Sequence, residues 1–128
     1  MKRNGKMGNI QNKLPAVVNP DGYTLEQGLA SVGKGWEILI RVAFRFKPDS
    51  VKIVQVKEKF AGLRIYTHFV EEDEDFESLL NILEHQSYRM CEWCGKEGTL
   101  DNRYYWLLTL CEQCKRKRKR EKQKVWVG

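Results

Sequence analysis

The chain has no long apolar run. No segment of its 128 residues approaches the roughly 20 apolar residues that a membrane-spanning helix needs. The N-terminal stretch MKRNGKMGNIQNKLP is polar and has no apolar segment of the kind found in signal peptides. We therefore expect a cytosolic protein that does not associate with membranes. Because a reducing cytosol keeps thiols reduced, its four cysteines are expected to bind metal rather than to form disulfides.

Recognisable catalytic motifs are also missing. The sequence contains neither a GxxxxGK[ST] phosphate loop nor a GxSxG turn. Its two histidines, His68 and His85, both precede the cysteines, so residues 91–128 contain no histidine to hold a catalytic cation as an HNH-type nuclease would require. The acidic cluster at residues 71–77 has no candidate nucleophile beside it. We therefore expect no enzyme activity and no small-molecule substrate.

Positive charge is concentrated near the C-terminus. Residues 115–124, KRKRKREKQK, carry a net charge of +7 against +6 for the whole chain, which leaves the other 118 residues at −1. The body of the protein is thus close to neutral. An anionic partner is expected for the basic segment, and the alternative is a solvated segment that only aids solubility.

Composition and periodicity divide the chain into three parts. Residues 1–21 are rich in glycine, asparagine, lysine and proline without periodicity, which predicts a flexible arm. Residues 22–90 are expected to form the body, beginning with a short helical turn near Leu25–Leu29. Residues 91–128 are expected to form a zinc finger with a basic C-terminal helix.

Within the body, apolar spacing predicts a helix, a β-hairpin and a second helix. Residues 36–46 have apolar side chains at helical spacing and end before Pro48. Residues 51–57 alternate imperfectly and residues 63–69 alternate cleanly, as expected of two strands, and the intervening EKFAG supplies a glycine for the turn. The acidic residues at 73–75 favour the start of the second helix.

The cysteines form two pairs with the spacing of a zinc site. Cys91-x2-Cys94 and Cys111-x2-Cys114 are separated by sixteen residues. A two-residue gap allows both thiolates of a pair to face one ion about 2.3 Å away. Gly95 follows Cys94, as expected of a tight turn in which backbone amides point toward sulfur. Four thiolates close the coordination sphere, so we expect one structural Zn²⁺, with metal-free thiols or tetrahedral iron as the alternatives.

The segment between the cysteine pairs completes a finger. Residues 99–110 are expected to form a hairpin with residues 101–103 at its tip, and Tyr105 and Trp106 are expected on a strand, with Trp106 in the core. A turn, a hairpin and a helix that starts at the second pair are the layout of a treble clef. The predicted fold class is α+β, in the order α-β-β-α-β-β-α, with a treble-clef-like finger at the C-terminus.

Three strings resemble a family of small, largely uncharacterised phage and prophage proteins. They are KEKFAGLRIY from Lys57, SYRMCEWCGKEGTL from Ser87 and WLLTLCEQC from Trp106, preceded by Gly35-Trp36 where the family has a GW-like motif. The sequence departs from the family pattern at Ala61, where glycine is usual, and at Cys114, where histidine is common. The resemblance implies a phage or prophage origin and a zinc site, and it implies no activity.

Two main functions and a weaker third one remain open. The first is binding of DNA or RNA through the basic segment, in a host cytosol if the protein is phage-encoded. The second is a protein-interaction module that modulates a host enzyme or polymerase, which would account for the neutral body; a virion component is a third, weaker possibility. The candidate nucleic-acid contacts are Lys115, Arg116, Lys117, Arg118, Lys119, Arg120, Lys122 and Lys124, together with Arg103 and Tyr104.

Overall fold

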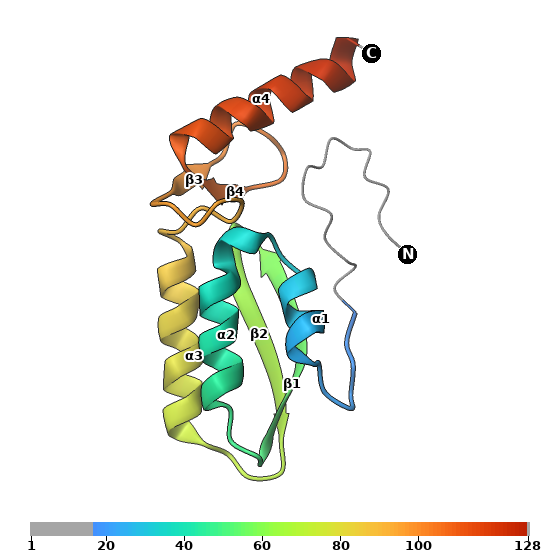
Figure 1. Ribbon diagram of the computed structural model, residues 1–128, viewed down its shortest axis with the longest axis vertical. Coiled ribbons are helices and arrows are strands. Elements are labelled where there is room, and N and C mark those ends of the chain that lie inside the picture. Colours follow the sequence, from blue (N-terminus) through green and yellow to red (C-terminus); the bar gives the residue numbers. More distant parts are fainter. Residues whose placement is uncertain (1–16, 128) are drawn as a thin grey trace.

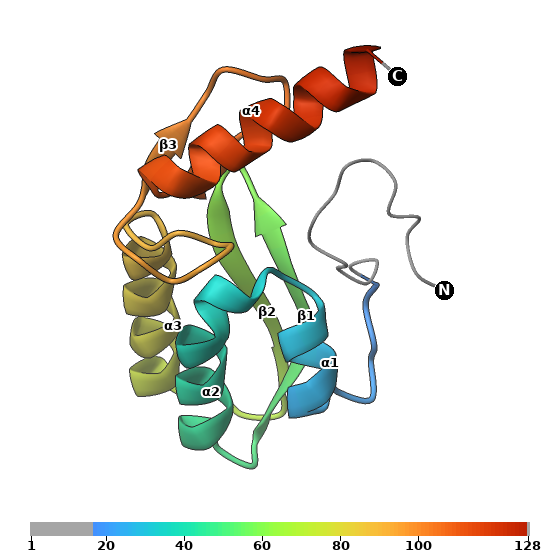
Figure 2. The ribbon, with the colours of Figure 1, turned by 45° about the horizontal axis from the view of Figure 1, so that its top comes forward.

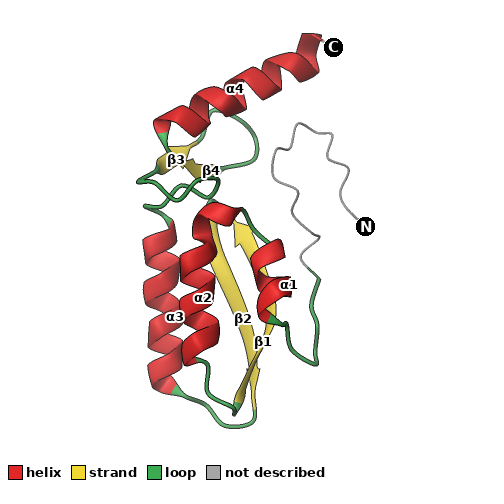
Figure 3. Ribbon diagram, in the orientation of Figure 1, coloured by secondary structure: helices red, strands yellow, loops and turns green. Residues whose placement is uncertain are grey.

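Helices and two antiparallel hairpins make up the described part of the chain (Figures 1 and 3). The computed structural model describes residues 17–127, so most of the predicted N-terminal arm lies outside the described residues. The elements in chain order are α1 (Leu25–Ala30), the 3-10 turn η1 (Lys34–Trp36), α2 (Glu37–Phe46), β1 (Val51–Lys59), β2 (Gly62–Phe69), α3 (Glu74–Ser87), β3 (Thr99–Asp101), β4 (Leu108–Leu110) and α4 (Glu112–Val127). The predicted α+β class is confirmed. We call residues 17–90 the body and residues 91–127 the cysteine module.

The body hairpin contains an irregularity that explains its imperfect alternation. β1 and β2 pair antiparallel from Val51 opposite Phe69 to Lys59 opposite Gly62, and the register shifts between Ile53 and Gln55. Such a bulge moves the following residues of β1 to the opposite face. The buried positions of β1 are accordingly 51 and 53 before the shift, and 56 and 58 after it.

The turn between β1 and β2 does not use its glycine as predicted. Phe60 and Ala61 hold the two turn positions, with φ angles of 52° and 71°, in the left-handed region that glycine usually occupies. Gly62 lies on β2 instead. Its lack of a side chain serves packing, because a Cβ there would lie 2.5 Å from Cζ of the Tyr88 ring.

The body core lies between the helices and the hairpin. Trp36, Ile40 and Ala43 are fully buried on the inner side of η1 and α2, which confirms the predicted amphipathic helix. α3 begins where the acidic residues predicted it, with the Asp73 side chain accepting a hydrogen bond of 2.9 Å from the amide of Phe76. Figures 1 and 2 show α2 and α3 side by side along the hairpin.

The second hairpin is shorter than predicted. β3 and β4 have three residues each, and residues 102–107 form the loop between them. Tyr105 and Trp106 therefore lie on the loop and not on a strand, with exposed fractions of 98% and 56%. The prediction of Trp106 in the core is wrong, because its indole N–H does not point into the module but donates a hydrogen bond to Glu58 of the body. Asp101 is buried on β3 and does not lie at a solvated tip.

Within residues 17–127, none of the helices combines the length and the apolar character required to cross a lipid bilayer.

Candidate metal centre

The four cysteines come together as their spacing predicts. All four Sγ atoms lie within 4.8 Å of one another, and those of Cys94 and Cys111 are 3.6 Å apart. A tetrahedron with metal–sulfur bonds of about 2.3 Å has sulfurs about 3.8 Å apart. Cys91, Cys111 and Cys114 are buried, and Cys94 is exposed. The cluster is compatible with a single structural metal ion.

The first pair lies on a tight turn. Gly95 adopts a φ of 88°, as the sequence predicted, and its amide donates to the carbonyl of Cys91 over 2.9 Å. The amide of Cys91 donates to the carbonyl of Lys96 over 2.7 Å. These two bonds fold residues 91–96 back on themselves and place both thiols on one side.

The second pair lies at the start of α4. The amide of Cys114 points to Sγ of Cys111 over 3.4 Å, and the amide of Lys115 donates to the carbonyl of Cys111 over 2.9 Å. A helix N-terminus presents partial positive charge, which favours a thiolate there.

The pKa values of the thiols are shifted in opposite directions within the cluster. Burial acts to raise the pKa of Cys111, but hydrogen bonds from the Cys114 amide and from neighbouring thiols lower it to about 7. Burial raises the pKa of Cys91 and of Cys114, and hydrogen bonds to neighbouring thiols add to the rise at Cys114. Four thiols this close cannot all ionise unless a cation lies among them. This donor set therefore fits a divalent metal.

One side of the cysteine module packs on the start of α2. The amide of Gly35 donates to the carbonyl of Glu92 over 2.7 Å, and the amide of Gly33 donates to the Glu92 carboxylate over 2.9 Å. The indole of Trp36 donates to the carbonyl of Met90 over 2.8 Å. A Cβ on Gly35 would lie 2.1 Å from the carbonyl oxygen of Cys91. The Gly35-Trp36 pair is thus explained by its direct contact with the first cysteine turn.

The β1–β2 turn also packs on the module. Its Ala61 carbonyl accepts a hydrogen bond of 2.8 Å from the hydroxyl of Thr109 on β4. The Glu58 carboxylate accepts from the amide of Ala61 over 2.8 Å and from the indole of Trp106 over 2.7 Å. The KEKFAG segment therefore holds β4 and the 102–107 loop. We call these contacts and those of Gly33–Trp36 the seam.

A buried ion-pair cluster joins β3 to α4. Asp101 pairs with Arg103 at 2.7 Å and with Arg118 at 3.1 Å, and both the Asp101 and Arg118 side chains are almost wholly buried. Burial alone would raise the pKa of Asp101, but hydrogen bonds from Arg103 and the charge of Arg118 lower it to about 2. Asp101 therefore stays ionised at neutral pH and fixes the base of α4 against the hairpin.

The basic residues of α4 fall into two groups. Arg118 and Lys115 are engaged within the module, where Arg118 also donates to the carbonyl of Trp106 and Lys115 donates to the Thr99 hydroxyl over 2.6 Å. The exposed cations are Arg116, Lys117, Lys119, Arg120 and Lys122. No carboxylate of the described residues pairs with any of these five. The side chain of Lys124 lies outside the described part.

The other two candidate nucleic-acid residues are partly occupied. Arg103 binds Asp101 through two nitrogens and donates to the carbonyl of Lys115, and its side chain remains 40% exposed. The Tyr104 ring is surrounded by cationic groups of Arg103, Arg118 and Lys122, about 5 Å from the ring centre.

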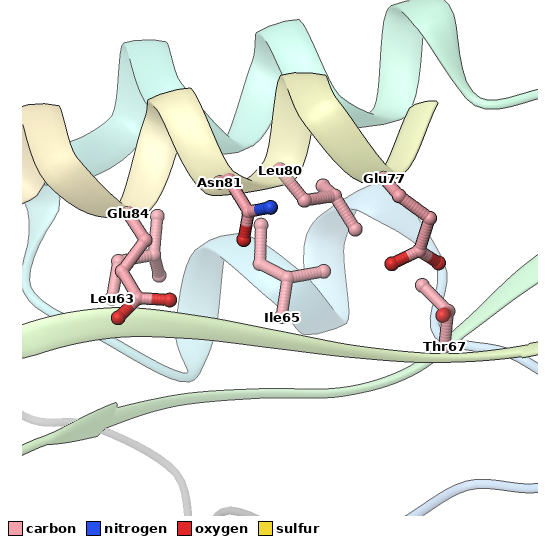
Figure 4. A pocket seen from close by; sticks show the side chains of 7 residues that line it. All are labelled: Leu63, Ile65, Thr67, Glu77, Leu80, Asn81 and Glu84. Atoms are coloured by element: carbon pink, nitrogen blue, oxygen red, sulfur yellow. The ribbon is translucent and has the colours of Figure 1, made fainter. Parts of the chain in front are cut away.

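A surface groove of the body lies between β2 and α3 (Figure 4). Its two carboxylates, Glu77 and Glu84, lie at opposite ends, separated by two turns of α3. Glu84 is engaged by Arg64 at 3.4 Å and by the Tyr88 hydroxyl at 3.3 Å. The groove therefore offers no closely paired acid and base. His68 and His85 are both exposed on the surface of the body.

Comparisons of this chain with models of protein families, with curated proteins and with solved structures found no match. The resemblance to small phage and prophage proteins stays a prediction.

Proposed function

We propose that Cys91, Cys94, Cys111 and Cys114 hold one structural zinc ion in a treble-clef-like finger. The support is the order of elements, with a cysteine turn, a short hairpin and a helix that starts at the second pair. A sphere of four thiolates leaves no position for a catalytic water, so the finger serves structure and not catalysis. Native mass spectrometry of the purified protein would give one zinc per chain, and bound iron would instead produce a coloured protein.

The finger presents α4 to nucleic acid. The observation that carries this proposal is the exposed face of α4, where five cations have no carboxylate partner among the described residues. Figure 1 shows the C-terminal half of α4 extending beyond the hairpin. Like charges three and four residues apart repel one another along a helix, and the phosphates of a nucleic acid relieve that repulsion.

Phosphate contacts of this kind give affinity without sequence information. Binding through α4 should therefore depend strongly on salt and weakly on sequence. Arg118, which lies inside the module, and Lys115, which bonds Thr99, are not part of this contact face. The face consists of the exposed cations Arg116, Lys117, Lys119, Arg120 and Lys122, the last of which also contacts the Tyr104 ring.

A salt series on three proteins tests the proposal. The first is the intact chain, and the second is Arg116→Gln/Lys119→Gln/Arg120→Gln, which removes three neighbouring cations of α4. The third is a matched control, Arg45→Gln/Lys52→Gln/Arg89→Gln, which removes the same charge from exposed positions of the body. The α4 variant should lose about tenfold or more in affinity for nucleic acid at low salt, and the slope of log K against log salt should fall by about 2 to 3.

The body variant separates a local contact from a general charge effect. It should bind almost as tightly as the intact chain, because none of the three substituted cations is on α4. Equal losses in the two variants would contradict a contact through α4. If the intact chain bound no nucleic acid at low salt, the proposal would fail, and a stoichiometric protein partner would become the better explanation.

A further inference from the structure

Three exposed aromatic side chains lie on the two turns that meet at the seam. Phe60 occupies the β1–β2 turn and is 67% exposed. Tyr105 and Trp106 occupy the 102–107 loop, with Tyr105 almost fully exposed. Burying such rings against a partner would remove a large apolar area from water, so their exposure on fixed turns requires an explanation.

The contacts of the loop hold the two turns together. Trp106 donates its indole N–H to Glu58 over 2.7 Å, two residues before Phe60. The Thr109 hydroxyl binds the carbonyl of Ala61, the residue after Phe60, over 2.8 Å. The two turns are therefore joined directly, which brings the three aromatic residues to one region of the surface.

The same loop is continuous with the basic helix. Arg118 of α4 donates to the carbonyl of Trp106, and the Tyr104 ring lies 4.9 Å from the guanidinium of Arg118 and 5.1 Å from the ammonium of Lys122. Figure 2 shows the loop rising beside α4. Lys59 adds a cation 5.7 Å from the centre of the Phe60 ring. The aromatic rings of Phe60 and Tyr104 thus lie beside cations of β1 and α4.

Aromatic side chains beside a cationic track are the means by which proteins bind single-stranded nucleic acid, since unpaired bases stack on the rings while lysine and arginine hold the backbone. A duplex keeps its bases stacked inside and offers only phosphates and groove edges to such a surface. We propose that Phe60, Tyr105 and Trp106 form a base-stacking platform, which makes single-stranded nucleic acid the preferred ligand of the α4 face. This inference rests on the proposed function and specifies its ligand.

Paired binding measurements test the platform with the full-length protein. The probes are a fluorescent single-stranded oligonucleotide of about 16 nucleotides and a duplex of the same length. The variant Phe60→Asn/Tyr105→Ser removes two rings whose loss leaves the fold intact, because asparagine tolerates the positive φ of position 60 and Tyr105 is 98% exposed. Its matched control, Phe46→Asn/Tyr66→Ser, removes two exposed aromatic rings from the body.

The platform variant should bind the single strand at least about tenfold more weakly than the intact chain, with its affinity for duplex changed by less than about twofold. The control should bind both probes normally. Unchanged affinity for the single strand, or an equal loss on both probes, would overturn the platform while leaving the charge contact of α4 in place. Failure of the intact chain to bind either probe would overturn the proposed function itself, and the two failures are therefore distinguishable.

Discussion

The body and the cysteine module are stabilised in different ways. The body buries a continuous set of large apolar side chains, including Trp36, Ile40 and Leu63. The buried cluster of the module consists of three cysteines with Leu108 and Leu110, and Trp93 packs against it. Two leucines bury too little apolar surface to order a segment of this size. The comparison teaches that the body is stabilised by burial, whereas the module relies on its ion pairs, its seam with the body and, as we propose, a bound metal ion.

The largest expected effect is the loss of a metal ligand. Cys114→Ser should abolish stoichiometric metal binding and unfold the module, because a structural zinc ion contributes on the order of 10 kcal/mol to such a domain. The body should remain folded. Metal analysis together with far-UV circular dichroism would measure both consequences.

The matched variant Cys114→His replaces one zinc ligand with another. It should retain the metal ion and the folded module, because an imidazole nitrogen can take the place of the thiolate. A Cys114→Ser protein that kept one metal ion per chain and a folded module would contradict the dependence on four ligands.

The next effect concerns the ion pairs at the base of α4. Asp101→Asn should destabilise the module by about 3 kcal/mol, since it leaves the guanidinium of Arg118 buried without a carboxylate. Urea denaturation of the metal-loaded protein would measure this loss. Glu112→Gln, which removes the exposed partner of Lys115 at 3.5 Å, is the control and should change stability by less than about 0.5 kcal/mol. Similar losses of stability in the two variants would show that the buried Asp101–Arg118 pair contributes no more than the exposed Lys115–Glu112 pair.

Breaking the seam on the α2 side should cost somewhat less. Gly35→Ala places a Cβ 2.1 Å from the Cys91 carbonyl oxygen and 2.5 Å from the Gly95 nitrogen, so the cysteine turn must move away from the body. We expect a destabilisation of about 2 to 3 kcal/mol, measured by thermal unfolding.

Gly28→Ala provides the comparison for Gly35→Ala. There the new Cβ meets the end of the Phe44 ring at 2.9 Å, and a side chain can yield where backbone cannot. The body should tolerate this change better. A larger loss for Gly28→Ala than for Gly35→Ala would contradict the role given to the seam.

The smallest expected effect is at the contact of the seam between β4 and the β1–β2 turn. Thr109→Val keeps the shape of the side chain but removes the buried hydroxyl that binds the Ala61 carbonyl. It should destabilise the protein by about 1 to 2 kcal/mol, the usual consequence of leaving a buried carbonyl without its donor. Thr109→Ser retains the hydroxyl and should lose less stability than Thr109→Val. The opposite order of stabilities in chemical denaturation would exclude a contribution from this hydrogen bond.

Sequence patterns predicted the features that arise locally. The spacing of the cysteines predicted the cluster, Gly95 predicted the left-handed turn, and apolar periodicity predicted α2, the β1–β2 hairpin and α3. Each of these was predicted from a pattern that repeats over a few positions, where backbone geometry limits the outcome.

The features that were missed depend on contacts across the chain. Glu58 and Glu92 resemble ordinary charged residues in the sequence, yet both are buried at the seam. Trp106 was predicted to be a core residue. The residues near it in the sequence indicate neither the length of β4 nor the hydrogen bond from its indole to Glu58. Arg118 could not be told apart from the other cations of its basic run, although helical spacing from Cys114 places it on the inward face.

Hydrogen exchange of the full-length protein, with and without a metal chelator, tests the central claim most directly. The account predicts that removal of metal makes amides of β3, β4 and the first turns of α4 exchange freely, while amides of α2 and β1 keep their protection. Protection that persisted in β3 and β4 after the metal had been removed would contradict the claim that the metal holds the module together.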